Sequence, residues 1–282
     1  MSFYGKINKT HNPRSLDLRN HYLGVTPQDI SKLEKWTMVI IDPGTENFAI
    51  RAEERSALTG IKTLWFDLVK IDSKDKANPD VYWNLNEYLI RMTKTVPNIN
   101  IVVIEWQMAI NYRTVRVSQH CVTFFDFYFR QRSTSKRSLC RLVEIDPQMK
   151  TQVLGGPTGQ KSSVTKKWSK YVASQLLCKR GDIKGLQTLE KNFSKRDDLS
   201  DTVALAEAYC ILNRLYSDFD SLEKDKVVKL LTVNPTEVEK NVERMGVSRK
   251  DFQTFLKVVE TLNLQEPSPQ RAIVETDLIF ED

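Results

Sequence analysis

The sequence predicts an α/β protein: a mixed five-stranded sheet flanked by helices, with an extension at each end of the chain. Apolar runs of strand length recur through the middle of the sequence. The first three follow one another closely, as in antiparallel hairpins, whereas helix-like segments separate the last two. Three successive strands followed by alternating helices and strands are typical of a mixed sheet with helices on its faces.

The five strands are expected where apolar residues run together or alternate. Leu64, Phe66 and Leu68 alternate with polar positions, which is the period of a half-buried strand. Ile101 to Ile104 form an uninterrupted apolar run, which is typical of a fully buried strand. The expected strands cover residues 38–41, 47–53, 61–71, 101–104 and 142–145.

Helices are expected where apolar side chains recur at helical spacing. One begins at Pro79 and places Val81, Leu85 and Leu89 on one face, and others are expected over 115–130, 163–178 and 198–216. A short helix is expected from Thr26 to about Lys35. The chain therefore divides into an N-terminal extension (1–36), a core (37–216) and an acidic extension (217–282) with expected helices over 232–242 and 251–262.

Composition excludes several classes of protein. Of 282 residues, 40% are apolar and 28% charged, as expected for a globular protein with a sizeable core. No apolar stretch has the roughly 18 residues of a membrane span, so no membrane partner is expected, and no secretory signal opens the chain. The four cysteines are scattered and there are only three histidines, which argues against a disulfide scaffold or a zinc site and favours a reducing, intracellular compartment.

The positive charge is concentrated in one segment. The formal net charge is +6, yet residues 106–180 hold 14 Lys and Arg against three acids, whereas residues 217–282 hold 14 acids against nine bases. A local surplus of this size is typical of proteins that bind a polyanion such as DNA. The alternative is a solvated surface with an accidental bias.

Acidic residues occupy the positions where a metal site would form. Asp42 and Glu105 each follow a buried strand, and Asp197, Asp198 and Asp201 begin a strong helical pattern. Clustered carboxylates suit Mg²⁺, which prefers hard oxygen ligands. Taken singly, each acid has an ordinary explanation, since aspartate often begins a turn and acids are favoured in the first turn of a helix.

The motifs around these acids resemble RuvC-type Holliday-junction resolvases of the ribonuclease-H-like superfamily, most closely the poxvirus, iridovirus and fungal mitochondrial branch. The matching motifs are Ile41-Asp42-Pro43-Gly44, Ile104-Glu105-Trp106-Gln107 and the Asp198/Asp201 pair. The resemblance covers about residues 37–216 and implies a ribonuclease-H-like sheet. It also implies that Asp42, Glu105, Asp198 and Asp201 are the catalytic metal ligands, with Asp197 as a substitute.

The resemblance further implies a DNA-binding surface. The family's two DNA-contacting lysines fall on Lys150 and Lys161, in what reads as a strand exit and a basic loop. Arg113, Arg116 and Tyr112 could hold phosphates and stack on a base, or they could form an ordinary exposed helix face. Lys166 and Lys167 would extend the same surface. The aromatic residue that enters the junction stays unassigned between Trp106 and Tyr112.

The function expected from the resemblance is Mg²⁺-dependent resolution of four-way DNA junctions by paired nicks. Two Mg²⁺ ions, for which Mn²⁺ would substitute, would activate a water and stabilise the departing 3′ oxygen. A homodimer is expected, with a protein partner for the acidic extension. The location would be a viral replication site in the cytoplasm or nucleus, or alternatively a mitochondrion. The alternatives in function are a non-cleaving junction-binding or scaffolding protein and a broader nuclease for branched DNA.

Overall fold

The structure is a computed structural model that describes residues 19–21, 27–71, 80–96, 98–132, 140–157 and 162–218. The helices expected over 232–242 and 251–262 lie outside these residues. Strands and helices follow one another along the described chain in the predicted order, with additional short elements.

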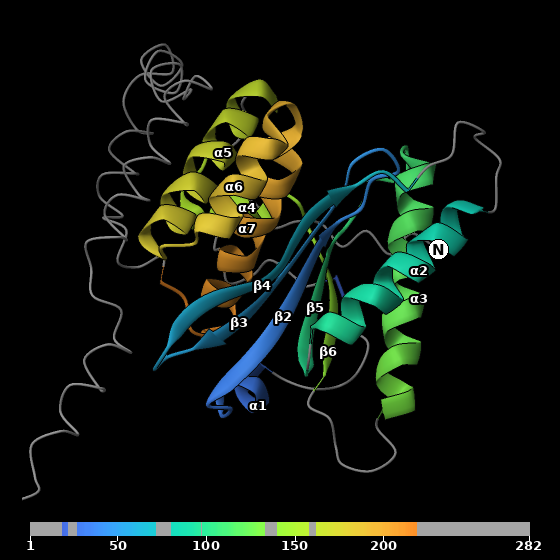
Figure 1. Cartoon of the computed structure of the whole chain (residues 1–282), viewed down its shortest axis with the longest axis horizontal. Coiled ribbons are helices and arrows are strands. Elements are labelled where there is room, and N and C mark those ends of the chain that lie inside the picture. Colours follow the sequence, from blue (N-terminus) through green and yellow to red (C-terminus); the bar gives the residue numbers. More distant parts are fainter. Residues whose placement is uncertain are drawn as a thin grey trace, which may run out of the picture.

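A six-stranded sheet forms the centre of the fold, in the order β1-β6-β5-β2-β3-β4 (Figure 1). Strands β2, β3 and β4 pair antiparallel, β5 lies parallel to β2, and β6 lies parallel to β5. Strands β2 to β6 are the mixed five-stranded α/β sheet that the sequence predicted, so the fold prediction is confirmed, and β1 adds a sixth strand at one edge. The strand bounds are Arg19–His21 (β1), Lys35–Asp42 (β2), Phe48–Ser56 (β3), Gly60–Val69 (β4), Ile99–Glu105 (β5) and Arg141–Ile145 (β6).

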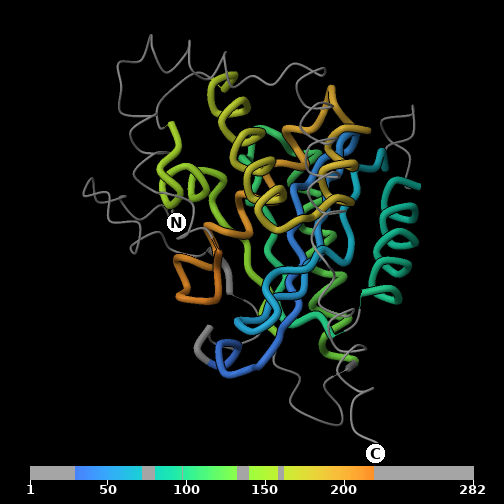
Figure 2. Tube along the Cα trace, turned by 60° about the vertical axis from the view of Figure 1, so that its left-hand side comes forward, coloured from blue at the N-terminus to red at the C-terminus, as the bar shows by residue number. Residues whose placement is uncertain are grey.

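Helices cover both faces of the sheet, as the two views in Figures 1 and 2 show. On one face, Val39 and Ile41 of β2 pack in a core with α2 and α3. On the other face, Met38 and Ile40 pack in a core with α5, α6 and α7. The helices are Pro27–Ser31 (α1), Asp80–Thr95 (α2), Tyr112–Arg132 (α3), Met149–Leu154 (α4), Ser162–Lys179 (α5), Ile183–Lys191 (α6) and Arg196–Leu212 (α7), with the short 3₁₀ helix Phe193–Lys195 (η2) before α7.

The structure differs from the prediction at several element boundaries. The sixth strand, β1, pairs antiparallel with β6 and is too short to show an alternating pattern in the sequence. Helix α1 ends at Ser31 because β2 already begins at Lys35. Helices α4 and α6 were not predicted, since each is short. None of the described helices combines the length and apolar character that a membrane crossing would need.

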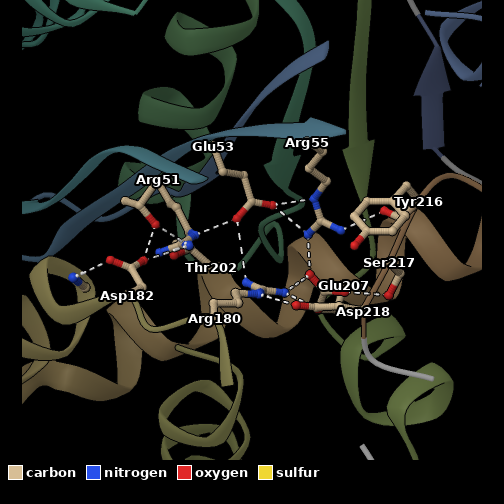
Figure 3. A network of polar contacts seen from close by, with 12 residues as sticks. Arg51, Glu53, Arg55, Arg180, Asp182, Thr202, Glu207, Tyr216, Ser217 and Asp218 are labelled. Atoms are coloured by element: carbon tan, nitrogen blue, oxygen red, sulfur yellow. Dashed lines mark hydrogen bonds and ion pairs between the residues drawn. The ribbon is translucent and has the colours of Figure 1, made fainter. Parts of the chain in front are cut away.

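Strand β3 also continues past its predicted end at residue 53, to Ser56. Its Arg51, Glu53 and Arg55 side chains are fully buried although all three are charged. They lie in the network of polar contacts that Figure 3 shows, which also contains Arg180 of the α5–α6 turn and Glu207 of α7. Each of these arginines pairs with at least one carboxylate of the network, so the charged face of the strand is buried as its apolar face is.

Carboxylates that each pair with two arginines hold this network together. Arg51 and Arg55 donate to the two carboxylate oxygens of Glu53 at 2.8 Å and 2.7 Å. Arg55 and Arg180 both donate to Glu207. Burial favours a higher pKa for Glu53, but the charges of Arg55, Arg51 and Arg180 outweigh it and lower the pKa to about 2. Glu53 therefore stays ionised, and β3 is fixed to α7 by charge as well as by packing.

The substitution Glu207→Gln tests this network. It leaves the buried guanidinium groups of Arg55 and Arg180 without one of their carboxylates, so we expect the free energy of unfolding to fall by roughly 3–5 kcal/mol. Urea denaturation measures the effect. The control is Glu54→Gln, whose carboxylate pairs with the exposed Lys35 at 3.2 Å and should contribute less than about 1 kcal/mol. Equal stability of the two variants would contradict the role given to the network.

Candidate metal centre

The carboxyl ends of two neighbouring strands bring Asp42 and Glu105 together. Strands β2 and β5 run parallel with Ile41 opposite Ile104, so the next residue of each strand emerges at the same edge of the sheet. The turn after Asp42 depends on Gly44, since a Cβ atom there would lie 2.4 Å from the carbonyl oxygen of Asn47. The sheet therefore places the two predicted acids side by side.

The third acid comes from α7, which packs across the sheet. Asp201 lies in the second turn of this helix, and its carboxylate accepts a hydrogen bond from the Ser169 hydroxyl of α5. One oxygen from each of Asp42, Glu105 and Asp201 lies within 4.8 Å of the others. Three of the four predicted acids thus meet, although they come from three separate elements of the chain.

Burial and neighbouring acids raise the pKa values of Asp42 and Glu105. Burial is the main cause of the raised pKa of Asp42, and the charges of Glu105, Asp201 and Asp198 add to it. Burial likewise raises the pKa of Glu105, as does the charge of Asp201. A cation beside these groups would favour their ionised forms.

Such a cation is present in the form of Lys150. Its ammonium lies 3.0 Å from Oε2 of Glu105 and 2.7 Å from Oδ2 of Asp201, and the residue is only 4% exposed. Burial opposes its charge, but Asp201 and Glu105 outweigh burial and raise the pKa of Lys150. The family resemblance implied that Lys150 contacts DNA, and the structure places Lys150 in α4, buried against the acids. Its contact with DNA stays a prediction.

The other two acids of α7 lie beside the group of three. Burial, together with the charges of Asp197 and Asp201, raises the pKa of Asp198 to about 6. Its charge in turn raises the pKa of Asp42, although its carboxylate is outside the 4.8 Å group. Asp197 instead faces α5, where it pairs with Lys166 at 2.6 Å and Lys170 at 3.7 Å. Asp198 is therefore better placed than Asp197 to join the three converging carboxylates.

The predicted DNA-binding residues are spread over two helices. Tyr112 is 61% exposed at the start of α3, with the Arg113 guanidinium 5.9 Å from its ring. The Arg116 guanidinium lies over the Tyr82 ring of α2. On α5, Lys166 is exposed and Lys167 partly exposed, and Lys161 lies outside the described residues. These side chains keep their predicted role as a hypothesis.

Sequence reasoning missed Ser169 and the place of Lys150. Ser169 looks like an ordinary helix residue until α5 packs on α7 and brings its hydroxyl to Asp201. Lys150 gave a signal only through the resemblance, which pointed to DNA and not to the carboxylates. Neither contact shows in the spacing of residues along the chain.

The donor set fits a divalent cation of the Mg²⁺ type. Three carboxylates offer hard oxygen ligands within 4.8 Å of one another. The raised pKa values of Asp42 and Glu105 indicate that a positive charge would stabilise the ionised forms of these two groups. Asp42, Glu105 and Asp201 are the residues that would hold such an ion, with Asp198 as the adjacent fourth acid.

Comparisons with known proteins found similarity among solved structures. No family model matches the sequence, and no curated protein matches it. The yeast mitochondrial Holliday junction resolvase Ydc2 matches with 14% identity and a TM-score of 0.42 over 69% of this chain and 86% of its own. A structure of RuvC from Thermus thermophilus matches with 14% identity and a TM-score of 0.37. A second structure, of T. thermophilus RuvC in complex with a Holliday junction substrate, matches with 14% identity and a TM-score of 0.39. Both RuvC matches cover 63% of this chain and 95% of the other.

These solved proteins belong to the family that the sequence motifs resemble. At such low identity and TM-scores, the likeness carries no argument about residues or activity. What this chain does is therefore argued from its own carboxylates and basic groups.

The substitution Asp42→Asn tests the repulsion within the cluster. Because the folded protein disfavours the ionised form of Asp42, the neutral amide should raise the melting temperature at pH 7 in the presence of a chelator by at least about 2 °C. The gain should fade as the pH falls and Asp42 of the unsubstituted protein takes up its proton. Thermal melts from pH 7 to pH 4 measure both effects. Asp126→Asn, at an exposed pair with Arg130, is the control, and an equal gain there would contradict the interpretation.

Proposed function

We propose that this chain is a RuvC-type, divalent-metal-dependent DNA endonuclease that resolves four-way junctions. The observation that carries the proposal is the convergence of Asp42, Glu105 and Asp201 from β2, β5 and α7. Carboxylates so close together repel one another, and a protein that only binds DNA has no use for them beside a polyanion. Metal-assisted hydrolysis of a phosphodiester is the chemistry that uses them.

Each residue of the acidic cluster is assigned a role from its position. Asp42, Glu105 and Asp201 hold the metal, Asp198 completes the acidic set, and Ser169 fixes the orientation of the Asp201 carboxylate through its hydrogen bond. Two Mg²⁺ ions, or Mn²⁺ in their place, would supply an activated water and stabilise the negative charge that develops on the leaving 3′ oxygen. The cut would leave a 5′-phosphate.

The basic residues would position the DNA. Arg113 and Arg116 at the start of α3, together with Lys166 and Lys167 of α5, offer contacts to phosphates, and the exposed Tyr112 ring offers a stacking surface. Lys161 belongs to the same proposal on the strength of its motif. Contacts of this kind recognise the shape of a junction more than its base sequence.

The proposal includes a two-fold homodimer. A four-way junction is itself close to two-fold symmetric, so two copies would place their carboxylates at opposed strands and give paired nicks. The acidic extension (217–282) would bind a protein partner. The four cysteines are all free thiols, which supports a reducing compartment such as the cytoplasm, the nucleus or a mitochondrion.

The direct test is cleavage of a synthetic four-way junction by the Asp42→Asn variant. With Mg²⁺, we expect nicking to fall more than roughly 100-fold, since even supporting residues of metal sites cost 10–100-fold. Junction binding in a chelator should stay within about threefold, because the amide leaves the basic residues in place. Gel mobility shifts and denaturing gels measure the two effects, with Asp126→Asn as the control.

Three results would contradict the proposal. Undiminished nicking by Asp42→Asn would remove this residue from the mechanism. An unsubstituted protein that binds junctions but cuts nothing with Mg²⁺ or Mn²⁺ would be a junction-binding protein. Equal cleavage of flaps, forks and four-way junctions would show a broader nuclease for branched DNA.

A further inference from the structure

Lys150 occupies the place that a bound metal ion would need. Its ammonium is in contact with two of the three clustered carboxylates, Glu105 and Asp201, and the residue is buried. Among the lysines that the structure describes with their side chains, it alone is classed as buried. The carboxylates are thus already partly neutralised by the protein itself.

The ammonium and a divalent ion compete for the same oxygens. The nitrogen lies 2.7 Å from Oδ2 of Asp201 and 3.0 Å from Oε2 of Glu105, whereas a Mg²⁺ ion would bind such oxygens at about 2.0–2.1 Å. The other Asp201 oxygen accepts the Ser169 hydroxyl. A monovalent and a divalent cation on one pair of carboxylates would also repel each other strongly in this desolvated place.

The backbone that carries Lys150 is held in position. Helix α4 ends at Gly155 in the left-handed conformation (φ 72°), where the glycine backbone closes the helix. The next residue, Gly156, lies against the Trp168 ring so closely that a Cβ atom would be 2.7 Å from it. Helix α4 also packs along α7. A change at the cluster must therefore come from the lysine side chain, whose four-carbon stem is flexible.

We propose that the Lys150 ammonium is a built-in counter-cation that must leave Glu105 and Asp201 before these carboxylates can hold a divalent ion. In the metal-free protein it offsets the repulsion between the acids and keeps the cluster folded. On metal loading it swings out of the cluster. The proposal rests on the proposed metal-dependent function and adds a competition between the protein's own cation and the metal.

The first test measures Mn²⁺ binding by isothermal titration calorimetry to the Lys150→Met variant. The unbranched apolar side chain fills the place of the lysine stem but carries no ammonium, so we expect Mn²⁺ to bind at least about tenfold more tightly than in the unsubstituted protein. Without metal, the variant should melt at a lower temperature than the unsubstituted protein, and Mn²⁺ should raise its melting temperature by more. Lys150→Arg keeps the positive charge and should keep the weaker binding. Lys179→Met, whose lysine donates to the Asp218 carbonyl, is the control and should change neither quantity.

A second measurement needs no substitution and covers the case in which Lys150→Met does not fold. Amine-reactive labelling of the unsubstituted protein, read by mass spectrometry, should modify Lys150 slowly in a chelator and at least about fivefold faster with saturating Mg²⁺. Labelling of Lys179 should not change.

The outcomes separate this proposal from the proposed function. The competition is overturned if Lys150→Met binds Mn²⁺ no more tightly than the unsubstituted protein. It is also overturned if Lys150 stays protected from labelling under saturating Mg²⁺. In both cases, junction cleavage by the unsubstituted protein would still support the proposed function. Absence of both Mn²⁺ binding and cleavage in the unsubstituted protein would instead overturn the proposed function, and the competition with it.

Discussion

Repulsion among three clustered carboxylates limits how the strand ends and α7 can be brought together. Asp42, Glu105 and Asp201 meet within 4.8 Å, and burial disfavours the charges of Asp42 and Glu105. Such a cluster persists only when the surrounding elements hold it together and a cation offsets it. The parallel pairing of β2 with β5 supplies two of the acids, α7 supplies the third, and Lys150 supplies the positive charge.

Helix α7 links this cluster to the buried charge network of Figure 3. Asp201 contributes to the cluster, and Glu207, six residues further along the same helix, binds Arg55 of β3 and Arg180. The largely apolar surface of α7 packs against the sheet and α5 and would by itself allow the helix to slide. Ion pairs with defined geometry restrict such sliding. The network therefore helps to fix the position of α7 along its axis, and with it the position of Asp201 relative to the ends of β2 and β5.

Much of this arrangement could be predicted from local patterns. Asp42 and Glu105 follow uninterrupted apolar strands, and buried neighbouring strands that run parallel must end at one edge of the sheet. The order of strands and helices followed from the same periodicities. Asp201 was predictable as one of the acids that begin a helix. That Asp201 and not Asp198 joins the group of three depends on how α7 is rotated about its axis against the sheet, and the helical pattern does not encode this rotation.

The contacts that were not predicted are long-range contacts between charged side chains. Arg51, Glu53 and Arg55 look like the outer face of a strand, because charged residues are normally exposed. They are buried only because Arg180 and Glu207, more than a hundred residues away, complete their pairing. Lys150 was assigned to DNA through the family resemblance, and nothing near it in the sequence shows that two carboxylates face it.

The buried arginines also hold the last described residues of the chain. Arg55 donates to the Tyr216 carbonyl, the Ser217 hydroxyl donates to Glu207, and Arg180 binds the Asp218 carboxylate through two of its nitrogens. Residues 216–218 thus complete the interior even though they follow the last described helix. A shortened version of the protein for expression or crystallisation should therefore end after Asp218, because ending it a few residues earlier would leave two guanidinium groups short of acceptors inside the folded core.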